Sequence, residues 1–142
     1  MSWDLDRLLG DVVTDEGFRG ITYMDTTGHL TIGYGRNLEA HPYTRKEAEV
    51  WTRRHLEFCS VMAETYCGEA WRTMNDVRQE VIINMAYQLG YGGLSTFVQM
   101  RKAVRAGDWN EAARQGTDSQ WGRRHKARRT RLMDELRTGL KI

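Results

Sequence analysis

Apolar residues recur at helical spacing through most of the chain, beginning with its first segment. That first stripe, at steps of three and four residues, consists of Leu5, Leu8, Leu9, Val12 and Val13. Such steps place the apolar side chains on one face of an α-helix. Gly17 interrupts the pattern, so we predict a helix that ends there.

The next segment alternates apolar and polar residues instead. Alternation runs through residues 21–23 and again through 30–34, on either side of the turn signal Asp25-Thr26-Thr27-Gly28. The pattern predicts a β-hairpin. Within it, Gly33 and Gly35 mark a bulge or a close approach of the backbone.

The remaining chain predicts helices. Thr44 is a predicted N-cap, and Glu47 three residues later completes a capping box. The helix that follows is predicted to reach the mid-60s. Further helices are predicted over 76–89, over 96–106, from 108 through 113, from 119, and in a final segment with Leu132, Met133, Leu136 and Leu140. The stretch Gly90-Tyr91-Gly92-Gly93 is predicted as a loop. The expected fold class is therefore α+β and mostly helical, with one small hairpin near the start.

Length and composition narrow the class of protein. The 142 residues fit one domain that buries a core of its own. A chain with 40% apolar and 28% charged residues is typical of a soluble globule and not of a disordered protein. No apolar stretch approaches the roughly 20 residues that a bilayer-spanning helix needs. The first residues, Met1 to Asp6, lack the pattern of a signal peptide.

The net charge of +2 conceals two opposite halves. Residues 1–100 hold 9 Lys and Arg against 14 Asp and Glu, whereas residues 101–142 hold 12 against 5. A basic region of this kind attracts polyanions, and nucleic acid, a membrane surface and the anionic bacterial wall are all candidates.

The cysteines and histidines suggest neither a disulfide nor a metal site. Cys59 and Cys67 would lie about 12 Å apart on an unbroken helix, which is too far for a disulfide, so we expect two buried or half-buried thiols. The histidines are His29, His41, His55 and His125. Their spacing matches no metal-ligand pattern, and the sequence implies no cofactor.

Two carboxylates flank the step from helix to hairpin. Glu16 lies at the end of the first predicted helix, Asp25 begins the hairpin turn, and Thr31 lies in the strand after it. Glycosidic cleavage requires two acids in different environments, one that donates a proton to the leaving oxygen and one that stays ionised. An Asp before Thr-Thr-Gly is equally suited to shaping the turn. The pattern by itself leaves both interpretations open.

The residues around these acids resemble a known family. The segments Thr14–Gly20 and Tyr23–Gly35 are similar to phage-type lysozymes, the endolysins of glycoside hydrolase family 24. In the active-site motif of that family, eight residues separate a Glu from an Asp or Cys, and five more separate that residue from a Thr. Glu16, Asp25 and Thr31 have this spacing. The likeness continues through the helix over 78–90 to Gly139, and it is weakest over about residues 37–75.

The resemblance implies a lysozyme-like fold in one domain, residues 1–142. We expect a hairpin lobe over about 15–43, a helical lobe over about 1–14 plus 66–142, and a connecting helix over about 44–65. A cleft would separate the two lobes.

The resemblance also implies roles for the three motif residues. Glu16 would be the general acid that protonates the glycosidic oxygen. Asp25 would position or activate water and stabilise oxocarbenium character. Thr31, facing Asp25 across the hairpin, would help to hold that water, and the reaction would invert the anomeric carbon.

Residues outside the motif are expected to support the substrate or the acid. Counting back from Arg137-Thr138-Gly139, the family arginine that lies against the catalytic Glu falls on Arg128. Its basic neighbours Lys126, Arg129 and Arg131 leave that register open by about one residue. Tyr87 and Gln88 on the core helix, and Asn37 after the hairpin, are expected to bind sugar. The tryptophans Trp51, Trp71, Trp109 and Trp121 are expected in the core.

These expectations favour a muramidase. It would cut the β-1,4 bond between N-acetylmuramic acid and N-acetylglucosamine in peptidoglycan and cause host lysis. Two alternatives are a wall-binding module without catalysis and a nucleic-acid binder that uses the basic C-terminal third. The intact motif argues against the first, and the lack of base-stacking aromatic residues in the basic segment argues against the second.

The endolysin hypothesis carries expectations about partners and location. Peptidoglycan is the expected partner, without nucleic acid or stable membrane insertion, and the protein is expected to be a monomer. It would stay in the host cytoplasm until a holin gives it access to the periplasm and the cell wall.

Overall fold

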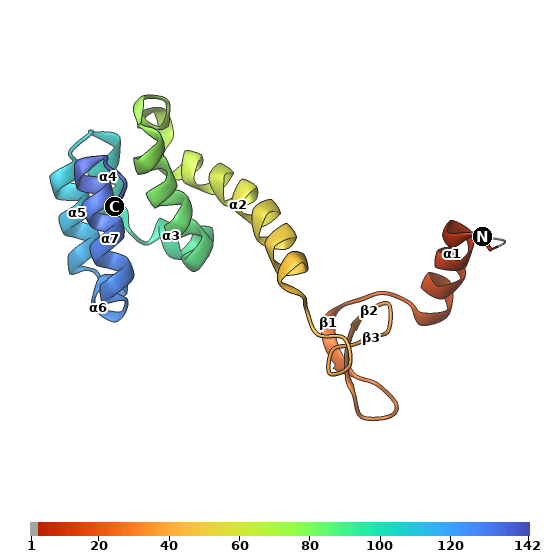
Figure 1. The fold of residues 1–142 in the computed structure, drawn as a ribbon. Coiled ribbons are helices and arrows are strands. Elements are labelled where there is room, and N and C mark those ends of the chain that lie inside the picture. Colours follow the sequence, from red (N-terminus) through yellow and green to blue (C-terminus); the bar gives the residue numbers. More distant parts are fainter. Residues whose placement is uncertain (1–2) are drawn as a thin grey trace. The chain divides into compact units, whose positions relative to one another are not determined.

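The computed structural model describes residues 3–142, so the first two positions of the expected helical lobe lie outside the described residues. It divides the chain into two compact units, residues 1–49 and 50–142, which are described separately below. The fold is mostly helical α+β, with a small antiparallel sheet near the start (Figure 1). This confirms the predicted fold class.

Unit 1 begins with the predicted helix, α1 (Leu5–Glu16). The Asp4 side chain caps it by accepting a hydrogen bond from the Arg7 backbone N–H at 2.8 Å. Gly17 ends it with φ 69°. The helix therefore stops where the sequence predicted, directly after Glu16.

A three-stranded antiparallel sheet follows α1, in the order β1-β2-β3. The strands are β1 (Arg19–Met24), β2 (Leu30–Gly33) and β3 (Arg36–Asn37). The predicted hairpin corresponds to β1 and β2, and the Asp25–Gly28 turn joins them. The third strand is absent from the prediction, because two residues are too few to show an alternating pattern.

The loop after β3 is closed by an arginine that the sequence analysis did not single out. The guanidinium of Arg36 forms a bidentate ion pair with Glu47, at 2.7 and 2.9 Å, and donates to the carbonyl oxygens of His41 and Pro42. Glu47 also accepts from the Thr44 backbone N–H, and Thr44 Oγ1 accepts from the Glu47 N–H, so the predicted capping box is confirmed. The hydrogen bonds from Arg36, together with those from the backbone N–H and the hydroxyl of Thr44, lower the pKa of Glu47 to about 2.

That capping box starts α2 (Arg45–Cys67), which ends in the mid-60s as predicted and leads into the 3-10 helix η1 (Gly68–Thr73). The remaining helices are α3 (Asp76–Ser95), α4 (Val98–Arg105), α5 (Trp109–Asp118), α6 (Gln120–Arg124) and α7 (Lys126–Thr138). Asn75, Asp108 and Ser119 cap three of them with side-chain oxygens.

Two details of the helical prediction are wrong. Gly90 is non-helical, with φ 69°, but the chain resumes a helical turn after it, so Tyr91 to Gly93 belong to α3 and not to a loop. Leu140 lies beyond α7 and is exposed, because Gly139 adopts a left-handed conformation and ends the helix.

The core of unit 2 gathers apolar side chains from α2 through α7. Its largest fully buried members are Tyr66, Ile82, Met85, Leu94, Met100, Leu132 and Leu136. The buried Tyr66 hydroxyl donates to the Phe97 carbonyl oxygen at 2.7 Å, so its polar end is satisfied. Figure 1 shows α5 and α7 side by side within this unit.

The cysteine prediction is confirmed, and the tryptophan prediction is confirmed in part. Cys59 and Cys67 are free, buried thiols, and burial raises the pKa of Cys67 to about 12. Trp121 is buried, and Trp71 and Trp109 pack against the core. Trp51 is not a core residue, because 57% of it is exposed.

Among the described residues, no helix combines the length and the apolar character that crossing a membrane requires. The same residues bring no three His, Cys, Asp or Glu side chains together in an arrangement that would hold a metal ion.

Candidate active site

The predicted site residues are divided between the two units. Glu16, Asp25, Thr31 and Asn37 belong to unit 1, whereas Tyr87, Gln88 and Arg128 belong to unit 2. In unit 1, α1 presents Glu16 from its last position, and the sheet presents the other three.

Hydrogen bonds fix one oxygen of the Asp25 carboxylate. Asp25 Oδ1 accepts from the backbone N–H of Thr27 at 2.9 Å, from the Thr27 hydroxyl at 2.9 Å and from the backbone N–H of His29 at 2.8 Å. The His29 N–H is the largest cause that holds the pKa of Asp25 below its usual value, and the hydroxyl and N–H of Thr27 act in the same direction against partial desolvation. Asp25 is therefore ionised at neutral pH.

These contacts reconcile the two interpretations that the sequence left open. Oδ1 shapes the turn, as an Asp before Thr-Thr-Gly commonly does. All three hydrogen bonds go to Oδ1, which leaves Oδ2 available to accept from a water or to face a developing positive charge.

The backbone of His29 connects Asp25 to Thr31. The His29 carbonyl oxygen accepts both the Asp25 backbone N–H and the Thr31 hydroxyl, each at 2.9 Å. Thr31 is almost fully buried, so its hydroxyl has a fixed direction. Sequence reasoning named His29 only as a poor metal ligand and missed this role, because it uses the backbone and leaves no signal in the side chain.

The strand register corrects one expectation about Thr31. Thr31 pairs with Tyr23 across the hairpin, and Asp25 lies opposite His29. Thr31 is therefore a diagonal neighbour of Asp25 and not its direct partner. Residues two positions apart share a face of a strand, so the two side chains lie on the same face of the sheet.

Asn37 shapes the loop after β3. Its Oδ1 accepts from the backbone N–H groups of Glu39 at 2.9 Å and Ala40 at 3.1 Å. Its amide nitrogen keeps both hydrogens for another acceptor.

In unit 2, Arg128 is held by a residue that the sequence analysis did not single out. Its Nε and one terminal nitrogen both donate to Asn84 Oδ1, at 3.0 and 2.6 Å. Arg128, Asn84 and Tyr87 line one pocket of about 650 Å³, formed by α2, α3 and α7. The structure thus brings together two of the predicted site residues of this unit.

Tyr87 also belongs to a row of aromatic rings. It meets His55 edge-on with ring centres 5.5 Å apart, and His55 stacks on Trp51 at 4.7 Å. Trp51, although exposed, thus packs on a neighbouring ring one helical turn along α2.

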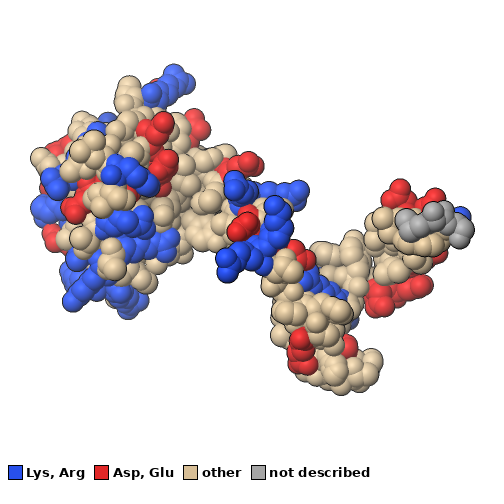
Figure 2. Space-filling model, in the orientation of Figure 1, with Lys and Arg blue, Asp and Glu red and all other residues tan. Residues whose placement is uncertain are grey.

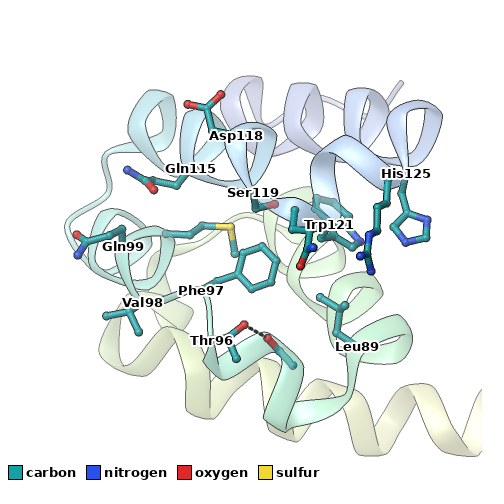
Figure 3. A pocket seen from close by; sticks show the side chains of 14 residues that line it. Leu89, Thr96, Phe97, Val98, Gln99, Gln115, Asp118, Ser119, Trp121 and His125 are labelled. Atoms are coloured by element: carbon teal, nitrogen blue, oxygen red, sulfur yellow. Dashed lines mark hydrogen bonds between the residues drawn. The ribbon is translucent and has the colours of Figure 1, made fainter.

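Gln88 lines neither this pocket nor a second one, but it holds a residue of the second. Its Oε1 accepts from the indole N–H of Trp121 at 2.9 Å. Trp121 lines a pocket of about 490 Å³ together with Phe97, whose ring meets it edge-on. Figure 3 shows these two rings inside the pocket, with Gln99, Gln115 and His125 around them.

The basic character of the C-terminal third is concentrated in α6 and the first half of α7. Its cations are Arg123, Arg124, Lys126, Arg128, Arg129 and Arg131, and none of them forms an ion pair with Asp or Glu among the described residues. Figure 2 shows Lys and Arg side chains gathered on the visible face of unit 2 around α6. This segment supplies the uncompensated positive charge that the sequence indicated.

Comparisons with known proteins identify the family. The family model described as "Phage lysozyme" matches residues 13–135. The pre-baseplate central spike protein Gp5 of Enterobacteria phage T4 is 31% identical over 152 residues, which cover 88% of this chain and 26% of that protein. The protein named "Probable T4-type lysozyme 1" of Dictyostelium discoideum is 26% identical over 153 residues, which cover 88% of this chain and 90% of that protein. This chain therefore spans about a quarter of the length of the phage protein.

The Asp25 hydrogen bonds predict a measurable titration. Thr27→Val removes the hydroxyl but keeps the backbone N–H groups, so the pKa of Asp25 should rise while staying below its usual value. Carboxyl ¹³C chemical shifts recorded against pH measure it. Thr26→Val is the control and should leave the titration unchanged. If neither variant changes the titration midpoint of the Asp25 carboxyl group, the Thr27 hydroxyl contact is contradicted.

The Asn84 contact predicts that Arg128 and Arg131 differ in stability. Arg128→Ala removes two charged hydrogen bonds from a half-buried site and should lower the free energy of unfolding by about 1–2 kcal/mol. Arg131 is exposed, so Arg131→Ala should change the free energy of unfolding by less than about 0.5 kcal/mol. Urea unfolding measures both. A larger loss for Arg131→Ala would show that the assigned register of the supporting arginine is wrong.

Proposed function

Since this chain belongs to the phage lysozyme family, we propose that it hydrolyses the β-1,4 bond between N-acetylmuramic acid and N-acetylglucosamine in bacterial peptidoglycan. One observation carries the proposal: Asp25 is an ionised carboxylate with one oxygen locked into the turn and the other free. A glycosidase that uses water needs such a group, because the carboxylate must keep both its charge and its position during the reaction.

Asp25 and Thr31 together would orient the attacking water. The Thr31 hydroxyl donates its hydrogen to the His29 carbonyl oxygen, so toward a water it can act only as an acceptor. Asp25 Oδ2 is likewise an acceptor. A water that donates one hydrogen to each oxygen would present a lone pair to the anomeric carbon. The buried position of Thr31 fixes one of these two directions.

Glu16 would supply the proton that the leaving oxygen needs. It lies at the exposed end of α1, in the same unit as Asp25. Attack by a separate water on the face opposite the leaving group inverts the anomeric carbon, so we propose that a β bond yields an α product. Glu16 as acid and Asp25 as base then have distinct roles.

The remaining predicted residues would bind or support the substrate. Asn37 retains its amide hydrogens for a sugar oxygen, and Tyr87 offers a half-exposed ring in the pocket that Arg128 also lines. Gln88 already accepts from Trp121, so it would contact substrate through its amide nitrogen. The supporting role of Arg128 stays a prediction.

For the biological role we propose host lysis by an endolysin. In that role the protein would act as a monomer, and a holin would release it from the host cytoplasm to the periplasm and wall. The relative from phage T4 is a pre-baseplate central spike protein, which favours a second candidate role: opening the wall with the same chemistry as part of a particle. Deletion of the gene distinguishes the two, because loss of an endolysin blocks release of progeny whereas loss of a particle component blocks particle assembly or entry.

Substitution of the proposed acid tests the activity. Glu16→Gln keeps the size of the side chain and removes its proton, so the rate of clearing of permeabilised Gram-negative cells should fall by at least about 100-fold. Asp11→Asn, an exposed carboxylate on the same helix, is the matched control and should clear cells like the wild type.

Other outcomes decide between the alternatives. Equal clearing by Glu16→Gln would refute the assigned acid. If the wild type binds the wall but clears no cells, the protein is a wall-binding module without catalysis. If it binds nucleic acid tightly and clears no cells, it is a nucleic-acid binder. For an active enzyme, proton NMR should detect the α anomer as the first product, and a β anomer would contradict inversion.

The water-holding role of Thr31 predicts a difference between two substitutions. Thr31→Val removes the acceptor and should slow hydrolysis at least about tenfold, the equivalent of one hydrogen bond of about 1.4 kcal/mol. Thr31→Ser retains the hydroxyl and should stay within about threefold of the wild type. The rates are measured on soluble peptidoglycan oligomers.

Stability serves as the control for that pair. The His29 carbonyl oxygen keeps the Asp25 N–H as a partner in Thr31→Val, so the variant should remain folded. If Thr31→Val and Thr31→Ser hydrolyse at the same rate, the hydroxyl does not hold the water.

A further inference from the structure

The carboxyl group of Glu16 packs directly on the backbone of the β2–β3 turn. A Cβ atom placed on Gly35 would lie 2.5 Å from Glu16 Oε2, 2.9 Å from Cδ and 3.3 Å from Cγ. These distances leave no room for a side chain at position 35 while Glu16 keeps its place. Glu16 forms no ion pair among the described residues, so no charged partner holds its carboxyl group beside Gly35.

Gly33, the last residue of β2, provides a comparison. Gly35 has φ +74° and Gly33 has φ +70°, and both values disfavour any side chain. A Cβ on Gly33 would meet no atom within 4 Å. The two positions thus impose the same backbone requirement, and they differ in what an added methyl group would touch.

We propose that Gly35 is a positioning residue for the general acid. The inference rests on the proposed function, in which Glu16 donates the proton. The bare Cα of Gly35 lets the carboxyl group lie over the turn, and any side chain there displaces it. Because Glu16 is exposed and flexible, its carboxyl group would swing away with little loss of stability. The rate would suffer, since a misplacement of about 1 Å can cost about 100-fold in catalysis.

Gly35→Ala and Gly33→Ala, compared side by side, test the proposal. Both variants should lose similar amounts of stability in thermal unfolding, because they share the same strained φ. On soluble peptidoglycan oligomers, kcat of Gly35→Ala should be lower than that of Gly33→Ala by about 30-fold or more, with KM values within about threefold of each other. A lower kcat with an unchanged KM indicates a displaced acid and not a weakened binding site.

A second pair of variants covers the case in which alanine prevents folding. Asparagine tolerates a left-handed φ better than alanine, so Gly35→Asn and Gly33→Asn relieve the strain while both still add a Cβ. The same excess loss of kcat is expected for Gly35→Asn. In a Glu16→Gln background, where no acid remains to be displaced, the residual rates of the position-35 and position-33 variants should become equal.

The outcomes separate this proposal from the proposed function. If folded wild type releases no product, the proposed function fails and Gly35 has no acid to position. If wild type is active and the position-35 and position-33 variants have equal kcat, Gly35 is only a turn residue and the positioning role is wrong. A loss confined to KM would equally overturn it.

Discussion

The reciprocal pairing of Asp25 with the backbone of His29 organises the first unit. The Asp25 N–H donates to the His29 carbonyl oxygen, and the His29 N–H donates to Asp25 Oδ1, so one short turn closes the hairpin and immobilises the carboxylate. The same carbonyl oxygen accepts the Thr31 hydroxyl, which ties the second strand to the turn. Because each of these bonds has a backbone group of His29 as one partner, the arrangement depends on the strand register.

The two proposed catalytic carboxylates are held by different means. Asp25 is fixed by three hydrogen bonds that also keep it ionised. Glu16 lies beside Gly35, where an added side chain would overlap its carboxyl group. Hydrogen bonds to a carboxylate stabilise its charged form, and those to Asp25 also hold its carboxylate in one orientation. The fixed, ionised carboxylate of Asp25 suits the member of such a pair that must stay charged.

The second unit combines a packed core with an uncompensated basic segment. Residues 123–131 carry six Lys and Arg that make no ion pair among the described residues, so the positive field of the C-terminal third is not cancelled locally. Arg128 differs from its neighbours, because Asn84 orients its guanidinium in a pocket. A long-range field and one oriented guanidinium are separate properties, and both come from the same short stretch of sequence.

The sequence by itself determined the helices, the first two strands, the turn and the spacing of Glu16, Asp25 and Thr31, because local periodicity and capping leave a signal in neighbouring residues. The two-residue strand β3 and the helical turn after Gly90 gave no such signal. Only the tertiary structure decided that Arg36 reaches Glu47, that Asn84 holds Arg128, that Trp51 stays exposed and that Glu16 lies on Gly35. Each of these depends on backbone geometry or on residues at least four positions apart, and the spacing of residue types along a chain does not encode such contacts.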